Sequence, residues 1–148
     1  MILYYRVFGL IADIVLLTNV IFIVAVLGLF DAALTLPGIA GIVLTVGTAV
    51  DANILIYERI REEIAVGASP WAAVNAGFDK AFSAIADSNV TMLMAGGVLF
   101  LFGSGPVRGF AVTLCIGIVT SMFTALIGSR ALIHLIYGRR RRIERLAI

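Results

Sequence analysis

Apolar residues gather in four long stretches of this chain, separated by short polar segments. The stretches cover about residues 8–30, 36–57, 85–102 and 110–137. Roughly 20 residues of helix, rising about 1.5 Å each, cross the ~30 Å hydrocarbon core of a bilayer. Backbone groups in lipid must be satisfied within their own segment, so each stretch is expected to be helical. The pattern predicts an all-α membrane protein, a bundle of four transmembrane helices.

A different pattern fills the connection between the second and third stretches. Ser69 followed by Pro70 is typical of a helix start, with the serine as N-cap and the proline in the first turn. Over residues 70–84, apolar side chains recur at helical spacing opposite polar ones, and they are Trp71, Val74, Phe78, Ala81 and Phe82. The pattern predicts an amphipathic helix lying in the membrane interface, with its tryptophan at headgroup depth.

The distribution of Lys and Arg predicts which side of the membrane each end occupies. The turn at residues 31–35 has no basic residue, and the turn at 103–108 has only Arg108. The other side collects Arg6, Arg59, Arg61, Lys80, Arg130 and the basic tail at residues 138–148. By the positive-inside rule both chain ends are then cytoplasmic, and the tail is expected to contact anionic lipid. Residues 1–6 are interpreted as the tail of an earlier span.

Composition supports a membrane protein and excludes other classes. Of the 148 residues, 61% are hydrophobic and 14% charged, against roughly 45–50% and 25% in soluble domains. The net charge of +2 reflects basic residues beside membrane segments, so no nucleic-acid partner is expected. The single cysteine, Cys115, lies in an apolar stretch and offers neither an intrachain disulfide nor a thiolate cage. No metal or other cofactor is expected.

Asp51 is the residue that points most directly to a function. It lies about 22 Å along the second predicted helix, inside the hydrocarbon region. An aspartate there costs about 2.5–3.5 kcal/mol to insert, so its side chain should face protein or water. Thr48 and Gly47 share its helical face: the hydroxyl can hydrogen-bond the carboxyl group, and the glycine leaves room for a partner helix or water. The alternative is a permanently protonated acid with a structural hydrogen bond, but intramembrane ionisable residues usually mark a transport pathway.

Other polar residues of the stretches allow both functional and structural interpretations. Asp87 opens the third stretch, with Thr91 one turn on along the same face, and the pair could serve a proton relay or simply reach water. Asn53 points away from Asp51 on an ideal helix and is interpreted as a tether to another helix. His134 lies beyond the expected hydrocarbon end of the last helix and is interpreted as an interfacial residue.

Small side chains recur every four residues along the fourth stretch. They are Gly109, Thr113, Gly117, Ser121 and Ala125, and the second stretch carries a similar set in Gly41, Thr45 and Ala49. Such a ladder lets helix backbones approach closely in a membrane. Both helices are therefore expected to pack tightly against their neighbours.

Several segments closely resemble the SecD branch of the SecD/SecF family, membrane subunits of the bacterial Sec protein-export machinery within the resistance–nodulation–division superfamily. The segments are LPGIAGIVLT at residues 36–45, AVDANILI at 49–56, ERIREE at 58–63, AFSAI at 81–85 and the small-residue ladder of 109–125. The resemblance covers nearly the whole chain, and the segment around Asp51 is highly specific. At Met92 the family more often has a second threonine after Thr91, a departure that concerns helix packing.

The resemblance implies a function and a set of partners. The chain is similar to the last part of a six-helix membrane half, without its first helix and the large extracytoplasmic domain that contacts preprotein. The implied partners are a SecF-like half, the SecYEG translocon and membrane lipids, in the bacterial cytoplasmic (inner) membrane. On this analogy Asp51, helped by Thr48, Asp87 and Thr91, takes part in proton passage that drives a late stage of preprotein translocation. The chain would be a transporter-type protein rather than an enzyme.

Two other functions compete with this interpretation. Asp51 and Asp87 could form the dyad of an intramembrane aspartyl protease, in which two carboxylates share a proton and activate water. The Gly-x-Gly-Asp motif of those proteases is missing, because Asp51 follows Thr48-Ala49-Val50. The second alternative is another proton-coupled exporter of the same superfamily, and the specific run after Asp51 argues against it.

Overall fold

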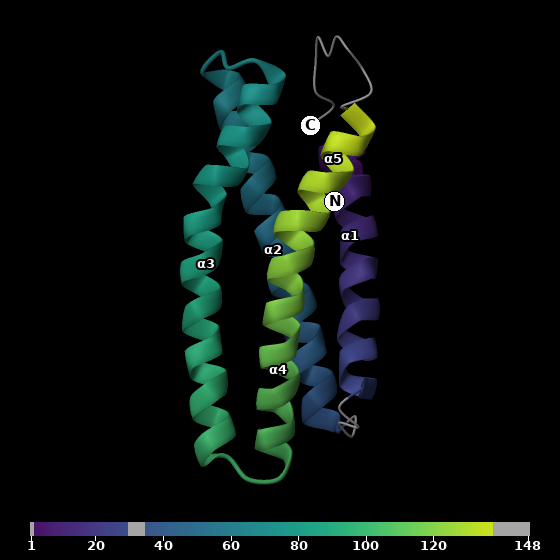
Figure 1. Ribbon diagram of the computed structural model, residues 1–148, viewed down its shortest axis with the longest axis vertical. Coiled ribbons are helices and arrows are strands. Elements are labelled where there is room, and N and C mark those ends of the chain that lie inside the picture. The colour runs from purple at the N-terminus through teal and green to yellow at the C-terminus, as the bar shows by residue number, and fades with distance from the viewer. Residues whose placement is uncertain (1, 30–34, 138–148) are drawn as a thin grey trace.

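The chain folds into a bundle of long helices. The computed structural model describes residues 2–29 and 35–137, so the predicted basic tail at residues 138–148 lies outside the described residues. Every regular element in these ranges is helical: α1 (Ile2–Leu29), α2 (Leu36–Ala65), α3 (Pro70–Phe102), α4 (Pro106–Phe123), the π-helical turn η1 (Thr124–Gly128) and α5 (Ser129–Tyr137). Because α4, η1 and α5 follow one another directly, the chain makes four passes along the molecule (Figure 1).

Each pass has the length and composition of a membrane span. The candidate spans are Leu3–Leu29, Leu36–Ala65, Pro70–Phe102 and Pro106–Ile136. Large apolar side chains cover the outside of the bundle: Leu17, Ile21, Val43 and Leu101 are 66–72% exposed. In water such a surface would drive aggregation, whereas in a bilayer it faces lipid. The predicted all-α bundle of four spans is confirmed.

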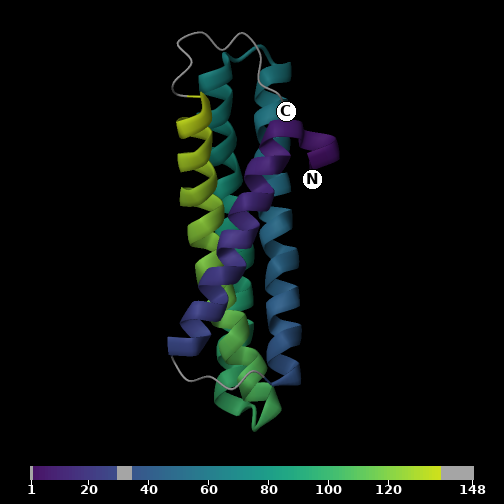
Figure 2. The same cartoon turned by 90° about the vertical axis from the view of Figure 1, so that its right-hand side faces the viewer.

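Both ends of the described chain lie at the same end of the bundle as the turn between α2 and α3 (Figure 1). At that end the first residues of α1 turn aside from the rest of the helix (Figure 2). The cause is Arg6, whose φ of 47° and ψ of −113° are non-helical and unfavourable for an L-residue. The break separates the first residues of α1 from the rest of the helix.

Residues 70–84 are helical as predicted, but they are continuous with the third apolar stretch and do not form a separate helix. They make up the first half of α3, which continues directly through the third apolar stretch. Ser69 caps α3 as predicted, accepting a hydrogen bond from a backbone N–H three residues on at 3.4 Å. Part of the predicted apolar face packs against α2: Val74 is buried, and a Cβ added at Gly77 would overlap Ile60, whereas Phe82 is 51% exposed. Helix–helix packing thus uses some of the side chains that the amphipathic pattern assigned to the interface.

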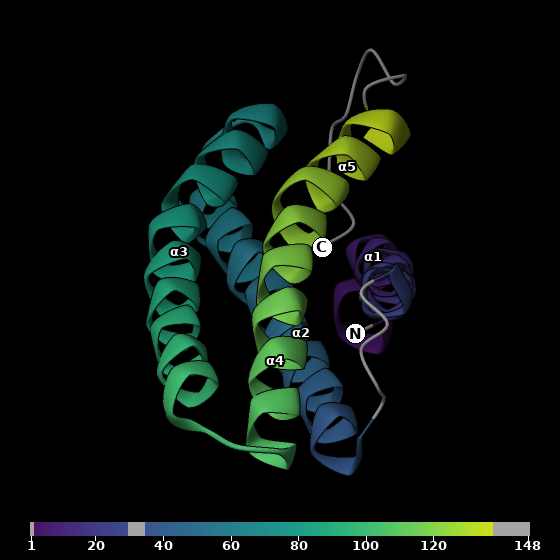
Figure 3. The same ribbon diagram turned by 60° about the horizontal axis from the view of Figure 1, so that its bottom comes forward.

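Helices α2 and α4 occupy the centre of the bundle, and α1 and α3 flank them (Figure 3). The two central helices contact each other through alternating glycine and threonine. A Cβ added at Gly41 would lie 3.3 Å from the Thr113 side chain, and one at Gly117 would overlap the side chain of Thr45. The threonine hydroxyls donate to carbonyls of their own helices, Thr45 at 2.8 Å and Thr113 at 3.1 Å. Each small residue therefore receives a threonine of the other helix, which brings the two backbones close together.

A second packing region fills the end of the bundle that holds the termini. Phe8 of α1 and Tyr57 of α2 are fully buried there, with ring centroids 5.4 Å apart. The first half of α3 contributes Val74 and Phe78, and α5 contributes Ile133. All four passes therefore meet in this region, which fixes α2 at one end while glycine–threonine packing fixes it further along.

The last pass contains one turn of π-helix, and the spacing of its buried residues explains why. Ser121, Ala125, Ser129 and Ile133 are all buried and lie four residues apart. An α-helix with 3.6 residues per turn would rotate roughly 40° past a full turn at each such step. Three steps would carry the last residue about 120° away from the core. The wider turn at Thr124–Gly128 absorbs an additional residue and returns Ser129 to the core-facing side.

Candidate functional site

Asp51 lies midway along α2, on the side that faces α3. A cavity of about 250 Å³ opens there. Besides Asp51 it is lined by Thr48, Ala52 and Leu55 of α2 and by Ile85, Ser88, Asn89 and Met92 of α3. The Asp51 side chain is exposed in the isolated chain. Because a water molecule takes up roughly 30 Å³, the cavity has room for several waters beside the carboxyl group.

The polar groups around Asp51 leave its carboxyl group without a partner in the described ranges. Thr48 Oγ1 donates to the Thr45 carbonyl at 2.9 Å, and Ser88 Oγ donates to the Ile85 carbonyl at 3.0 Å. Neither hydroxyl hydrogen is directed at Asp51, so Thr48 lines the cavity without making the hydrogen bond considered above. Both hydroxyl oxygens retain capacity to accept a hydrogen bond. The site can therefore receive a proton on Asp51 or a cationic group from outside the described chain.

Asp87 and Thr91 lie on an exposed face of α3 next to the cavity and do not line it. Thr91 Oγ1 donates to the Asp87 backbone carbonyl at 2.9 Å. The residues of α3 that do line the cavity are Ile85, Ser88, Asn89 and Met92, of which the sequence reasoning did not select Ser88 or Asn89. Their spacing of i, i+3, i+4 and i+7 from a buried isoleucine was the signal that could have found them.

The predicted packing residues divide into two groups. Asn53 accepts a hydrogen bond from Ser129 Oγ at 2.9 Å, so it joins α2 to the last pass. Gly109 lies against the Thr35 hydroxyl, 3.1 Å from where its Cβ would be. Ser121 is buried and donates to the Ile118 carbonyl at 3.0 Å. Gly47, by contrast, is exposed and has nothing within 4 Å of an added Cβ. On the Asp51 side, α2 thus presents an open surface.

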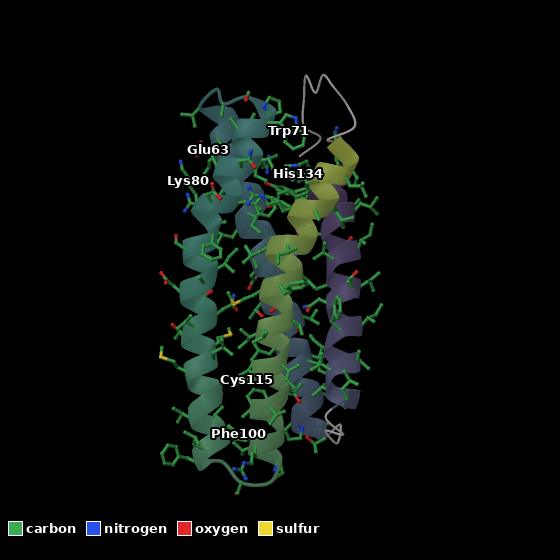
Figure 4. All side chains as sticks on the ribbon, viewed as in Figure 1. Glu63, Trp71, Lys80, Phe100, Cys115 and His134 are labelled. Carbon is green, nitrogen blue, oxygen red and sulfur yellow. The ribbon has the colours of Figure 1, made fainter. Side chains whose placement is uncertain are left out.

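Charged and aromatic side chains concentrate at the end of the bundle that holds the termini. Glu63 of α2 pairs with Lys80 of α3, and both side chains lie at this end (Figure 4). The rings of Trp71 and His134 stack with centroids 5.0 Å apart and planes 24° from parallel (Figure 4). These contacts join α3 to α2 and α5 at this end of the bundle. Over the described ranges, no three His, Cys, Asp or Glu residues gather in a way that could hold a metal ion.

A second ionic group ties α1 to α2 at the same end. Tyr5 donates its hydroxyl hydrogen to Glu58 Oε1 at 2.6 Å, and Arg61 Nη1 lies 3.3 Å from the same oxygen. The Arg61 guanidinium also lies over the Tyr4 ring, 5.1 Å from its centroid. Glu58 lies about two turns from Asp51 along α2. Its carboxylate is already partnered, as are those of Glu62 and Glu63, so Asp51 is the acid of α2 that has no partner among the described residues.

Comparisons with known proteins find relatives over nearly the whole chain. A family described as protein export membrane protein SecD/SecF, C-terminal, matches residues 1–139. The protein translocase subunit SecD of Calditerrivibrio nitroreducens is 55% identical over 148 residues, which are 100% of this chain and 28% of that protein. The subunit of the same name from Pseudomonas aeruginosa is 56% identical over 136 residues, or 92% of this chain and 22% of that protein. The chain thus spans less than a third of the length of these relatives.

Solved structures show the same fold. The crystal structure of SecDF in its super-membrane-facing form superposes with a TM-score of 0.85 at 44% sequence identity, covering 91% of this chain and 18% of that one. SecDF from Thermus thermophilus, a translocon-associated membrane protein, gives the same TM-score and identity over 90% of this chain and 18% of that one. Family match, sequence identity and fold agree over nearly every described residue. The chain belongs to the SecD/SecF family of protein-export membrane proteins and corresponds to the C-terminal membrane region of SecD.

Proposed function

We propose that this chain is the membrane part of a proton-driven motor for preprotein translocation, in which Asp51 gains and loses the coupling proton. The observation that carries the proposal is the placement of Asp51. It lies in the middle of a membrane-spanning helix, faces a cavity against α3 and has no partner within the described ranges. An unpartnered carboxylate at this depth is costly in lipid, so it belongs where another protein surface or a file of water covers it.

A SecF-like half is the partner that fits this open surface. The solved relatives carry the name SecDF, and this chain covers 18% of each of them, so most of the protein around the matching region lies outside this chain. A cationic group from the partner would favour ionised Asp51, whereas proton binding would release that group. Helices joined across Asp51 would then move with its protonation. Asp87 and Thr91, on the neighbouring face of α3, would join such a relay through water.

The remaining partners and the orientation follow the same proposal. Both ends of the described chain and the α2–α3 turn lie at one end of the bundle, the end with most of the basic residues. By the positive-inside rule this end faces the cytoplasm of the bacterial inner membrane. The SecYEG translocon would deliver the preprotein, and the extracytoplasmic domain of the full-length protein would hold it. The chain acts as a transporter component, without covalent chemistry.

The alternatives receive no support from the geometry. A protease dyad needs two carboxyl groups that share one site, and Asp87 does not line the Asp51 cavity. Another exporter of the same superfamily would have to share 55% of its residues with a SecD subunit over the whole chain. The export motor is therefore the function that the site supports best.

The decisive experiment replaces the carboxyl group of Asp51 in the full-length protein, assembled with its partner half in membrane vesicles. Asp51→Asn keeps the size of the side chain but cannot carry the proton, so the stimulation of preprotein export by the proton-motive force should fall at least ~10-fold, a loss within the range expected for a proton-transfer group. Asp51→Glu should retain part of it. Normal assembly with the partner half, measured by co-purification, is the control. Undiminished proton-dependent export by Asp51→Asn would refute the proposal.

A further inference from the structure

One buried polar contact joins the Asp51 helix to the last pass of the bundle. Ser129 Oγ donates a 2.9 Å hydrogen bond to Asn53 Oδ1, across 76 positions of sequence. Asn53 is 1% exposed and Ser129 is 0% exposed. The amide of Asn53 also donates to the Ala49 carbonyl of its own helix at 3.1 Å. Both the oxygen and the nitrogen of the amide are therefore hydrogen-bonded, which fixes the orientation of the Asn53 side chain on α2.

The position of Asn53 makes this contact relevant to Asp51. Two residues of α-helix correspond to a rotation of roughly 200°, so Asn53 and Asp51 leave α2 on opposite sides. Asn53 points to the last pass, and Asp51 points to the cavity against α3. A rotation of α2 that broke the Asn53 contact would turn the Asp51 carboxyl group by the same angle. A hydrogen bond on one face thus sets the direction of the acid on the other.

The partner serine is placed by the π-helical turn. Ser129 is the first residue after Thr124–Gly128, the segment that absorbs the additional residue of the last pass. Without that turn, the four-residue spacing would rotate Ser129 away from Asn53. Short π-helical turns are rare and occur frequently at functional sites. The irregular turn and the buried hydrogen bond are therefore parts of one local arrangement.

We infer that Asn53 and Ser129 form a positioning pair for Asp51. Their hydrogen bond fixes the rotation of α2 about its own axis relative to the π-helical turn of the last pass. The inference rests on the proposed function of Asp51 as the proton-carrying group. It assigns to the pair a role in setting the surroundings in which Asp51 exchanges its proton. Neither residue exchanges a proton itself.

Other charged and titratable groups near Asp51 could also change how readily it exchanges its proton. Asp51 is the one titratable residue among those that line the cavity. Other charged or titratable residues lie on the described elements that pack against α2. They are Tyr4, Tyr5, Arg6 and Asp13 on α1, Asp79, Lys80 and Asp87 on α3, Arg108 and Cys115 on α4, and Arg130 and His134 on α5; α2 itself adds Tyr57, Glu58, Arg59, Arg61, Glu62 and Glu63. None of these side chains takes part in the Asn53–Ser129 hydrogen bond. Substituting Ser129 therefore removes this hydrogen bond without removing a charge.

The test measures the pH profile of proton-driven export in the full-length protein with its partner half. Ser129→Ala removes the donor, and Asn53→Leu removes the acceptor at similar size. Each should shift the pH of half-maximal stimulation by about half a unit or more, equivalent to roughly a threefold change in apparent proton affinity. Ser129→Thr keeps the hydroxyl group and should restore much of the profile. Ser121→Ala is the matched control, because the Ser121 hydroxyl is equally buried but bonds only its own helix at 3.0 Å.

The outcomes separate this inference from the proposal on which it rests. If Asp51→Asn abolishes proton-driven export while Ser129→Ala and Asn53→Leu keep the wild-type pH profile, the positioning role is refuted and the function of Asp51 stands. A lower amount of folded protein with an unchanged profile also refutes it, since the contact is then structural only. If Asp51→Asn keeps full proton-driven export, the proposed function itself fails, whatever the profiles of the other variants.

Discussion

At the scale of single residues, α2 carries polar side chains on two faces, and the surroundings of these two faces differ. Asn53 faces the inside of the bundle, where Ser129 satisfies it at 2.9 Å. Asp51 faces the cavity against α3, where no described side chain binds it. Polar groups in hydrocarbon are costly without a partner. Asn53 is therefore satisfied by a described residue, whereas no described residue satisfies Asp51.

A comparison of two buried asparagines should measure how much a hydrogen-bond partner contributes to the stability of the fold. Asn19 of α1 and Asn53 of α2 are both at most 1% exposed. Neither the Nδ2 nor the Oδ1 atom of Asn19 has a hydrogen-bond partner among the described residues, whereas Asn53 has two. Asn53→Ala should therefore destabilise the protein by about 1 kcal/mol more than Asn19→Ala, because only Asn53→Ala breaks satisfied hydrogen bonds. Thermal unfolding of the purified protein in detergent would measure the difference.

The two substitutions control for each other, because each removes the same atoms from an equally buried position. Equal losses of stability would mean that packing alone accounts for both asparagines. A larger loss for Asn19→Ala would show that the Asn19 amide is satisfied by a group beyond the described residues, such as a buried water molecule. Either result would contradict the prediction.

Residue type and helical spacing were enough to select Asp51 but not to complete its surroundings. An acid inside a 22-residue apolar stretch is visible in the sequence, at residues 36–57. Which residues of α3 face it depends on how the two helices are rotated, and the sequence does not state that rotation. We selected Asp87 and Thr91 by chemical type, whereas the face toward α2 carries Ser88 and Asn89. Chemical type alone therefore selected the correct helix, α3, but the face next to the one that lines the cavity.

At the scale of helices, small residues determine how closely the two central passes approach. Gly117 receives the side chain of Thr45, and Gly41 lies against Thr113. Lipid offers no hydrophobic driving force for helix association, so close packing of this kind carries much of the stability. The four-residue ladder predicted close packing, but the pairing of each glycine with a threonine of the other helix became visible only in the fold.

A methyl group added to this contact should be poorly tolerated. Gly117→Ala places a Cβ against Thr45, which is itself buried and hydrogen-bonded to the Gly41 carbonyl at 2.8 Å. Overpacking of this kind costs about 1–3 kcal/mol, and we expect a loss in that range from thermal unfolding. Gly97→Ala is the matched control, since nothing lies within 4 Å of its added Cβ and alanine favours helix. If Gly117→Ala were as stable as Gly97→Ala, the close α2–α4 contact would be wrong.

Two features of the helices could not be predicted from periodicity. The amphipathic pattern of residues 70–84 indicated an interfacial helix, because burial against lipid headgroups and burial against α2 require the same apolar face. The π-helical turn was equally hidden, although the buried residues from Ser121 to Ile133 repeat every four positions. Such spacing fits an α-helix that curves or one that contains a wide turn. Only the positions of the neighbouring helices decide between them.

At the scale of the whole molecule, the bundle is closed on one side of α2 and open on the other. The closed part packs against α4 and α3, and the open part carries Asp51 and Gly47, one helical turn apart, beside the cavity that α3 also lines. Gly47 has no neighbour within 4 Å of an added Cβ, and Asp51 has no partner among the described residues. A second protein surface placed there would cover both residues. This is the geometric basis for expecting a SecF-like half on this face.

Photo-crosslinking tests that expectation directly. With p-benzoylphenylalanine in place of Gly47, ultraviolet illumination of the assembled full-length protein should crosslink this chain to its SecF-like partner half, because the added side chain would project into the partner. The same photoreactive residue at Ile21, which is 68% exposed on α1, is the matched control and should crosslink to the partner at least several-fold less. Equal crosslinking from the two positions, or crosslinking from Ile21 alone, would place the partner elsewhere. Asp51 would then face lipid or water, and a partner cation could not control its protonation.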